Sequence, residues 1–272
     1  MNDRSRHRGG AVKLERISLI VHSDKSDSSS VTTKIERWAS SHDIAISEDD
    51  PDLVIAAGGD GTMLRAAQTA HREDAPLLGI NLGRLGYLPE VEVGGEDEAL
   101  TRISSGDFHL EERMMLRCED STGTERVALN EVLVERSTRH RLVRLAVKVS
   151  GEQLATFSAD GLILSTPTGS TAYALSAGGP LVSPRTQCMV LVPVSAHMLF
   201  SRPLVLAPDD EVQIDVDPGG DTAATALDGA DGWDVPPGRS ITIRRHPRPL
   251  NLVRLSGPRF LERLRTKLDL PG

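Results

Sequence analysis

The sequence predicts an α/β N-terminal domain with a parallel sheet, followed by a β-rich C-terminal domain whose strands are antiparallel and sandwich-like. Three observations lead to this fold class. In the first third of the chain, short apolar runs alternate with segments of helical periodicity. From about residue 108, alternating strand patterns are separated by Gly, Asp and Pro turns. With 272 residues, the chain is long enough for one large domain or two modest ones.

The N-terminal elements follow from the spacing of apolar residues. Four short apolar runs are typical of strands in a parallel sheet: residues 16–21, 43–47, 52–57 and 76–81. Helical spacing predicts one helix over 31–39, behind a Ser/Thr-rich start, and another over about 62–70. Segment 96–105 has acidic residues in its first turn and predicts a helix that ends at Gly106.

The second part of the chain has the period of strands. The clearest alternating stretches are residues 127–135, 142–149, 189–194 and 212–216. A short helix is expected around 171–176. The tail after Pro258 is amphipathic and predicts a helix that docks on a domain surface through one face. That face would carry Phe260, Leu261, Leu264 and Leu268.

These elements give four segments. Residues 1–10 are expected to form a disordered arm, and residues 11–107 the α/β domain. Residues 108–245 would form the β-rich domain, and residues 246–272 a tail and helix that pack back on the first domain. A ligand site is expected in the cleft between the two domains, a common place for such sites.

Composition and charge limit the function classes. A net charge of −8 argues against a general role in binding DNA or RNA, although backbone amides can still hold a small anion. No apolar run approaches the roughly 18–20 residues needed to cross a bilayer. Cys118 and Cys188 lie far apart, with no CxxC spacing, which fits a reducing cytosol. The sequence therefore predicts a cytoplasmic protein with no membrane or nucleic-acid partner.

The strongest local signal is residues 53–67, LVIAAGGDGTMLRAA, in which an apolar strand runs into a glycine-rich loop and then a helix. Gly58, Gly59 and Gly61 allow positive φ and let a ligand approach the backbone closely. Amides at a helix start suit phosphate oxygens. A carboxylate inside such a loop, here Asp60, needs a role such as holding a metal or accepting a proton. The alternative is a Gly-Asp-Gly turn whose Asp caps the next helix.

A second polar cluster is residues 160–180, DGLILSTPTGSTAYALSAGGP. Its hydroxyls and backbone donors suit a polar heterocycle, Tyr173 offers a flat face for stacking, and Asp160 can accept hydrogen bonds from an amide. The alternative is a Ser/Thr-rich turn that caps a helix. Asn130 and Glu131 are neighbours on a predicted strand, so they can reach one ligand only at a strand end, a bend or an edge.

Together these motifs resemble the NAD kinase family, within the wider superfamily of GGDGT kinases. The superfamily shares GGDGT after a strand, and residues 160–180 look like the long signature of NAD kinases. The pair Asn130 and Glu131 matches that family's Asn-Glu pair, and residues 79–90 resemble its segment after the fourth strand. Bacterial lipid kinases usually carry Asn-Glu directly after GGDGT, whereas Met63 follows here.

The resemblance implies phosphoryl transfer from ATP, or another donor, to the adenosine 2′-hydroxyl of NAD, which gives NADP. Asp60 is then expected to be the general base, because a carboxylate within reach can take the proton of a secondary alcohol. The family implies Asn130 at the adenine side of NAD, Glu131 at a ribose hydroxyl and Arg65 at a phosphate, although Arg65 could equally be a surface arginine. The complete expected set of nucleotide-binding residues is Gly58, Gly59, Gly61, Arg65, Asn130, Glu131, Asp160, Thr171, Ala172, Tyr173 and Ser176.

The resemblance also implies partners. Mg²⁺ or another divalent metal would accompany the triphosphate, with no set of protein metal ligands in the sequence, and the chain would form a homodimer or homotetramer. Ser158 stands where many bacterial members carry Arg, which leaves the choice of phosphoryl donor open. Two other functions remain: a GGDGT lipid kinase that acts on a diacylglycerol-like acceptor, and a catalytically silent NAD-binding sensor.

Overall fold

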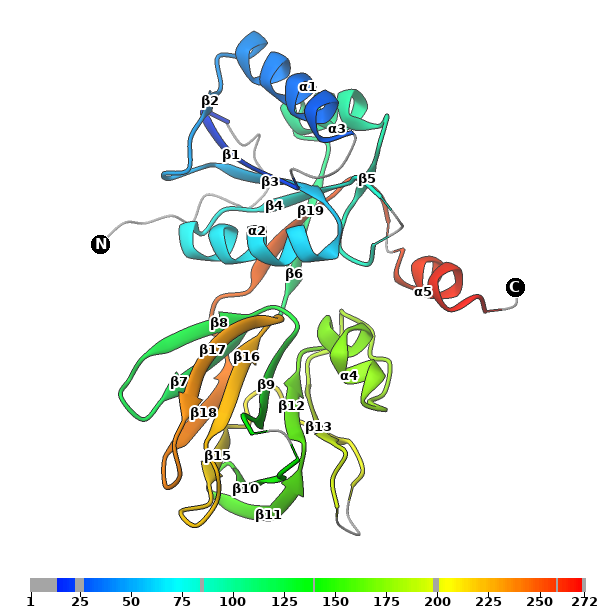
Figure 1. The fold of residues 1–272 in the computed structure, drawn as a ribbon. Coiled ribbons are helices and arrows are strands. Elements are labelled where there is room, and N and C mark those ends of the chain that lie inside the picture. Colours follow the sequence, from blue (N-terminus) through cyan, green and yellow to red (C-terminus); the bar gives the residue numbers. More distant parts are fainter. Residues whose placement is uncertain are drawn as a thin grey trace. The chain divides into compact units, whose positions relative to one another are not determined.

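The computed structural model describes residues 14–22, 27–83, 86–138, 140–197, 201–257 and 259–270 (Figure 1). They form two compact units. The first comprises the residues up to Glu112 together with those from Leu250 onward, and the second comprises Arg113–Pro249. The predicted N-terminal arm lies outside the described residues.

The first unit is built on a seven-stranded sheet in the order β2-β1-β3-β4-β19-β6, with β5 paired to β4. Its strands are β1 (Arg16–Val21), β2 (Ala45–Ile46), β3 (Leu53–Gly58), β4 (Leu77–Asn81), β5 (Val91–Glu92), β6 (His109–Arg113) and β19 (Leu250–Arg254). The pairs that join β1 to β2 and β3 are parallel, as are those that join β4 to β3, β5 and β19. Because β6 belongs to this sheet, the N-terminal part of the unit extends to Glu112 rather than to residue 107. Strand β19 brings the C-terminal part of the chain into the same unit.

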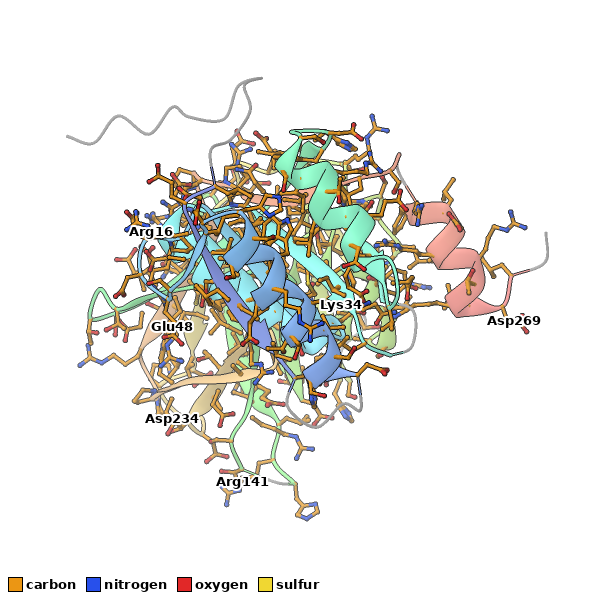
Figure 2. The ribbon with its side chains drawn as sticks, turned by 90° about the horizontal axis from the view of Figure 1, so that it is seen from above. Arg16, Lys34, Glu48, Arg141, Asp234 and Asp269 are labelled. Carbon is orange, nitrogen blue, oxygen red and sulfur yellow. The ribbon has the colours of Figure 1, made fainter. Side chains whose placement is uncertain are left out.

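Helices cover both faces of this sheet (Figure 1). The helices α1 (Ser28–Ser41) and α3 (Glu96–Ser104) lie on one face and α2 (Asp60–Glu73) on the other. The central strands β3 and β4 are therefore buried along their whole length, which is why they are apolar rather than alternating. Lys34 on α1, labelled in Figure 2, pairs at 2.8 Å with the buried Glu96 that begins α3.

The second unit contains two six-stranded sheets whose pairings are antiparallel. One has the order β11-β10-β15-β18-β7-β8 and the other β14-β13-β12-β9-β16-β17. The first consists of β7 (Leu116–Asp120), β8 (Glu125–Ala128), β10 (Val143–Val149), β11 (Glu152–Ala159), β15 (Val212–Val216) and β18 (Ser240–Arg245). The second consists of β9 (Glu131–Arg136), β12 (Gly161–Ser165), β13 (Met189–Val194), β14 (Leu204–Leu206), β16 (Ala223–Leu227) and β17 (Ala230–Val235). Both contribute to one apolar core around Phe157, so the predicted sandwich is confirmed.

One predicted strand is wrong in a way that matters for the site. The pattern over 127–135 predicted a continuous strand, but the chain leaves β8 at Ala128 and starts β9 at Glu131, and these strands belong to different sheets. Asn130 therefore lies in a bend rather than within a strand. The side chains of Asn130 and Glu131 therefore need not point to opposite faces, as they would within one continuous strand.

The C-terminal helix α5 (Phe260–Leu268) forms as predicted, but the prediction that it docks through its apolar face was wrong. Leu261 is 69% exposed and Leu268 is 39% exposed, whereas the one buried residue of the helix is Arg263. The Arg263 guanidinium donates to the backbone carbonyl of Tyr87 at 2.6 Å. The helix is thus attached to its own unit by a polar anchor, which a reading of apolar periodicity could not detect.

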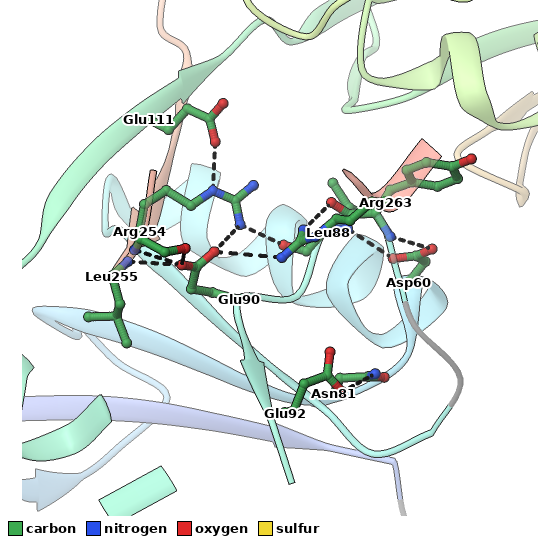
Figure 3. Close-up of polar contacts among 11 residues, drawn as sticks. Asp60, Asn81, Leu88, Glu90, Glu92, Glu111, Arg254, Leu255 and Arg263 are labelled. Carbon is green, nitrogen blue, oxygen red and sulfur yellow. Dashed lines mark hydrogen bonds and ion pairs between the residues drawn. The ribbon is translucent and has the colours of Figure 1, made fainter. Parts of the chain in front are cut away.

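A buried ion cluster joins this tail to the loop after β4 (Figure 3). Arg254 at the end of β19 donates to Glu111 at 2.6 Å and to Glu90 at 3.1 Å. The Glu90 carboxylate also accepts the backbone N–H groups of Leu255 and Ser256, each at 3.0 Å. Glu90 and Arg254 are 8% and 6% exposed, so both charges depend on their partners within this cluster for compensation.

We therefore expect Glu90→Ala to destabilise the first unit by about 3–5 kcal/mol, because it leaves the Arg254 charge buried and short of one partner. Trp38 lies in this unit and Trp233 in the other. Urea unfolding followed by Trp38 fluorescence in a Trp233→Phe background measures the effect. Glu98→Ala, at an exposed glutamate on α3, is the matched control. A Glu90→Ala loss no larger than that of the control would contradict this account.

Candidate active site

Asp60 is the first residue of α2, two positions earlier than the helix was predicted to begin. Gly59 is the N-cap and supplies no side-chain cap. The first N–H groups of a helix have no partner within it, and the helix dipole makes this end favourable for negative charge. Asp60 therefore lies in the first turn of α2, beside a backbone edge suited to an anion.

The Asp60 carboxylate is held by the loop that follows β4 (Figure 3). One oxygen accepts the backbone N–H of Tyr87 at 3.2 Å, and the other accepts that of Leu88 at 3.1 Å. Gly86 permits this approach, since a Cβ there would lie 2.6 Å from Asp60 Oδ1. The carboxylate is thus fixed by two neutral donors from a segment that the sequence places 27 and 28 residues away.

A third partner of Asp60 comes from the C-terminal helix. Lys267 Nζ lies 3.3 Å from Asp60 Oδ2 and 4.3 Å from the centroid of the Tyr87 ring. Burial raises the pKa of Tyr87, and the negative charge of Asp60 raises it further. Sequence reasoning missed Lys267, because nothing in an amphipathic tail links a lysine to a loop 207 positions earlier.

The glycines of the loop act differently from the prediction. None of the three adopts positive φ, so that reason for their presence was wrong. A Cβ at Gly58 would collide with the Thr62 side chain, which explains that glycine by packing. Nothing lies within 4 Å of a Cβ placed at Gly59 or Gly61, so their backbone is open to a ligand. Arg65 is exposed and follows Gly61 by four residues, which places it on the same side of α2.

In the second unit, Asp228 shapes the bend between β8 and β9. Its carboxylate accepts the backbone N–H groups of Leu129 and Asn130 at 2.7 Å each and that of Glu131 at 3.2 Å. Asp228 itself has φ 52°, a conformation that Asp tolerates in a tight turn between strands. No local sequence pattern links Asp228 to these three backbone partners, which lie 97 to 99 residues earlier.

Glu131 is buried at this bend. Its side chain accepts the backbone N–H of Tyr173, while Oε2 has no hydrogen-bond partner within the described structure. Burial and, to a lesser extent, the charge of Asp228 raise the pKa of Glu131 to about 7. A buried carboxyl with an unused oxygen is suited to a ligand hydroxyl, to which it can donate or accept.

The remaining predicted residues of this unit fall into two places. The 160–180 block folds against Asn130, whose carbonyl accepts the Thr166 N–H at 2.8 Å. The expected helix is divided at Ala172 into a 3₁₀ turn, Gly169–Thr171, and α4, Tyr173–Ser176. Thr171 and Ala172 are partly buried, whereas Tyr173 is 40% exposed and Ser176 is exposed, so the Tyr173 ring is available for stacking.

Asp160 is not brought to this group. It precedes β12, whose other end, Ser165, pairs with Glu131. At about 3.3 Å per residue, these two ends of β12 are separated by roughly 15 Å. The Asp160 carboxylate pairs instead with Arg136 at 2.7 Å.

Among the described residues, no group of three or more His, Cys, Asp or Glu side chains is placed to hold a metal ion. None of the helices in the described part of the chain is both long and apolar enough to span a membrane.

Two family models match the chain. The ATP-NAD kinase N-terminal domain matches residues 20–108, and the ATP-NAD kinase C-terminal domain matches residues 129–255. The NAD kinase of Corynebacterium diphtheriae is 45% identical over 225 residues, which cover 81% of this chain and 71% of that protein. The NAD kinase of Gemmatimonas aurantiaca is 44% identical over 233 residues, which cover 84% and 81% respectively.

Solved structures share the fold. An NAD kinase from Archaeoglobus fulgidus in complex with ATP aligns with a TM-score of 0.77 and 26% identity over 94% of this chain and 100% of that one. Yeast NADH kinase complexed with NADH aligns with a TM-score of 0.87 over 95% of this chain and 88% of that one. At 20% identity, the yeast structure supports the fold alone.

The position of Glu131 gives a pH-dependent prediction. Its pKa is raised from 4.5 to about 7 in the folded protein, so the folded state keeps the proton that the unfolded chain releases. The resulting stabilisation is complete below pH 4.5 and is lost as the pH rises through 7. We expect the parent to lose about 2 kcal/mol of its free energy of unfolding relative to Glu131→Gln when the pH is raised from about 5 to about 8.

Urea unfolding at both pH values, followed by Trp233 fluorescence in a Trp38→Phe background, measures this difference in the second unit. Glu152→Gln, at an exposed position, is the matched control. A Glu131→Gln stability difference that stays constant across this range would contradict the raised pKa.

Proposed function

This chain belongs to the NAD kinase family, and on that premise we propose that it transfers the terminal phosphoryl group of ATP to the adenosine 2′-hydroxyl of NAD, with Asp60 as general base. It is a phosphotransferase that acts on an alcohol group. The observation that carries the assignment of Asp60 is its position, with a carboxylate held firmly beside the open backbone of Gly59 and Gly61.

The proposed step has simple chemistry. The 2′-oxygen of NAD attacks the γ-phosphorus, the bond from that phosphorus to the β–γ bridging oxygen breaks, and ADP leaves. The hydroxyl proton passes to the Asp60 carboxylate, because a secondary alcohol is a poor nucleophile at neutral pH. Phosphoryl transfer otherwise depends on positioning and charge neutralisation. The backbone amides of Tyr87 and Leu88 perform the positioning by restricting the carboxylate to one orientation.

The triphosphate is proposed to bind at the start of α2. Gly59 and Gly61 leave room for phosphate oxygens to approach the backbone, and the helix end favours negative charge. Arg65, on the same side of the helix as Gly61, adds a cation. A divalent metal, Mg²⁺ or another, fits as a companion of the triphosphate, since Mg²⁺ commonly takes phosphate oxygens together with one or two carboxylates. When bound, it would neutralise phosphate charge.

The NAD side of the proposal rests on the bend between β8 and β9. Glu131 offers an unused carboxyl oxygen to a ribose hydroxyl, and Asn130 lies beside it for the adenine. Thr171 and Ala172 precede Tyr173, whose exposed ring can stack on a base or nicotinamide. Asp160 and Ser176 stay predictions of NAD contacts, and Asp160 would act at a separate point.

The alternative functions have less support. A diacylglycerol-type lipid kinase is not favoured, because the matches extend over both NAD kinase domains. A silent sensor would have no use for a carboxylate restrained beside a phosphate-binding edge. A cytoplasmic location and a homodimeric or homotetrameric assembly remain part of the proposal.

Asp60→Asn tests the base, because it keeps the shape of the side chain and removes its basicity. We expect kcat for NADP formation to fall by about 10²-fold or more, while the Kd of NAD measured by calorimetry changes less than about threefold. Asp97→Asn, at an exposed aspartate in the first turn of α3, is the matched control. Diacylglycerol offered in place of NAD tests the lipid kinase. Near-parental kcat in Asp60→Asn would remove the assignment.

A further inference from the structure

Helix α5 contacts the surroundings of Asp60 through two residues that lie one helical turn apart, Arg263 and Lys267. Arg263 is its buried anchor, and donates to the Tyr87 carbonyl at 2.6 Å while lying 3.7 Å from Glu90. Lys267 follows Arg263 by four residues and so lies on the same side of the helix. Arg263 thereby fixes the distance over which Lys267 reaches Asp60 and the Tyr87 ring.

The surroundings of Asp60 give this cation a specific use. The carboxylate lies next to the proposed phosphate-binding edge, where a bound phosphate would repel it and tend to turn it away. Two backbone amides orient it but carry no net charge. Lys267 supplies a positive charge from α5, and its ammonium group also lies over the Tyr87 ring.

A role in stability alone does not account for this arrangement. The side chains of Lys267 and Asp60 are 27% and 35% exposed, and a pair screened by solvent to that degree contributes little to folding. The tail is already attached by the buried Arg263 and Arg254. The value of the pair therefore lies in what it does to Asp60.

We propose that Lys267 is a positioning residue for the general base: it keeps the Asp60 carboxylate oriented at the start of α2. This inference rests on the proposed function of Asp60. The charged and titratable groups in contact with Asp60 in the described structure are Lys267 from α5 and Tyr87 from the loop after β4. Lys267 thus makes the C-terminal helix a part of the active site.

Lys267→Gln, Lys267→Arg and the control Arg265→Gln test this role in the full-length enzyme. Arg265 is an exposed cation on the same helix. We expect kcat for NADP formation to fall by about tenfold in Lys267→Gln, while the KM for NAD stays within about threefold of the parental value, because the carboxylate is then less firmly oriented toward the hydroxyl. Lys267→Arg restores kcat, since it keeps the charge, and Arg265→Gln leaves kcat unchanged.

The readouts separate the possibilities. A parental kcat in Lys267→Gln, with equal melting temperatures, would overturn the inference and leave a surface ion pair. An equal loss of kcat in Lys267→Arg would also overturn it, since the charge of the side chain would then not be the cause. Loss of activity in Asp60→Asn together with an unaltered Lys267→Gln sinks this inference alone. An active Asp60→Asn enzyme removes the proposed base and the role of Lys267 with it.

Discussion

The rest of the site depends on one constraint, the fixed orientation of the Asp60 carboxylate. Asp60 sits at the start of α2, where two backbone amides and one lysine fix it beside an open backbone. An unrestrained aspartate at a helix end would cap the helix or turn to solvent. Here both oxygens are engaged from outside the helix, so the carboxylate keeps one orientation before any substrate arrives. Restraint of this kind is what general-base catalysis requires of its base.

Much of the first unit serves this hold. The loop after β4 must pass close to Asp60, which Gly86 permits, and must stay there, which Glu90 ensures by joining it to the tail. The chain returns through β19 and presents Arg254 to Glu90 within a buried cluster. Helix α5 then adds Lys267. The glycine loop around Asp60 and helix α5 therefore belong to one structural unit, despite their separation in sequence.

The sequence predicted what local pattern and motif can encode. The strand, glycine loop and helix around Asp60 were read correctly in type, because a buried apolar run followed by glycines leaves few alternatives. The prediction of one continuous strand over 127–135 was wrong because apolar alternation continues through a bend that Asp228 stabilises from about a hundred residues away. The predicted docking face of α5 was wrong for a related reason: Arg263 attaches the helix by hydrogen bonds, whereas helical periodicity detects only apolar faces. Lys267 had no local signal, since its partners are fixed by tertiary structure.

A crystal structure of the protein with bound NAD would show where the Asp60 carboxylate lies relative to the sugar hydroxyl that it is proposed to deprotonate. We expect an Asp60 oxygen about 3 Å from the adenosine 2′-oxygen, with the bonds from Tyr87 and Leu88 retained. A structure in which the adenosine ribose lies well beyond hydrogen-bond reach of Asp60, with its 2′-hydroxyl facing another acidic side chain, would contradict this role of Asp60.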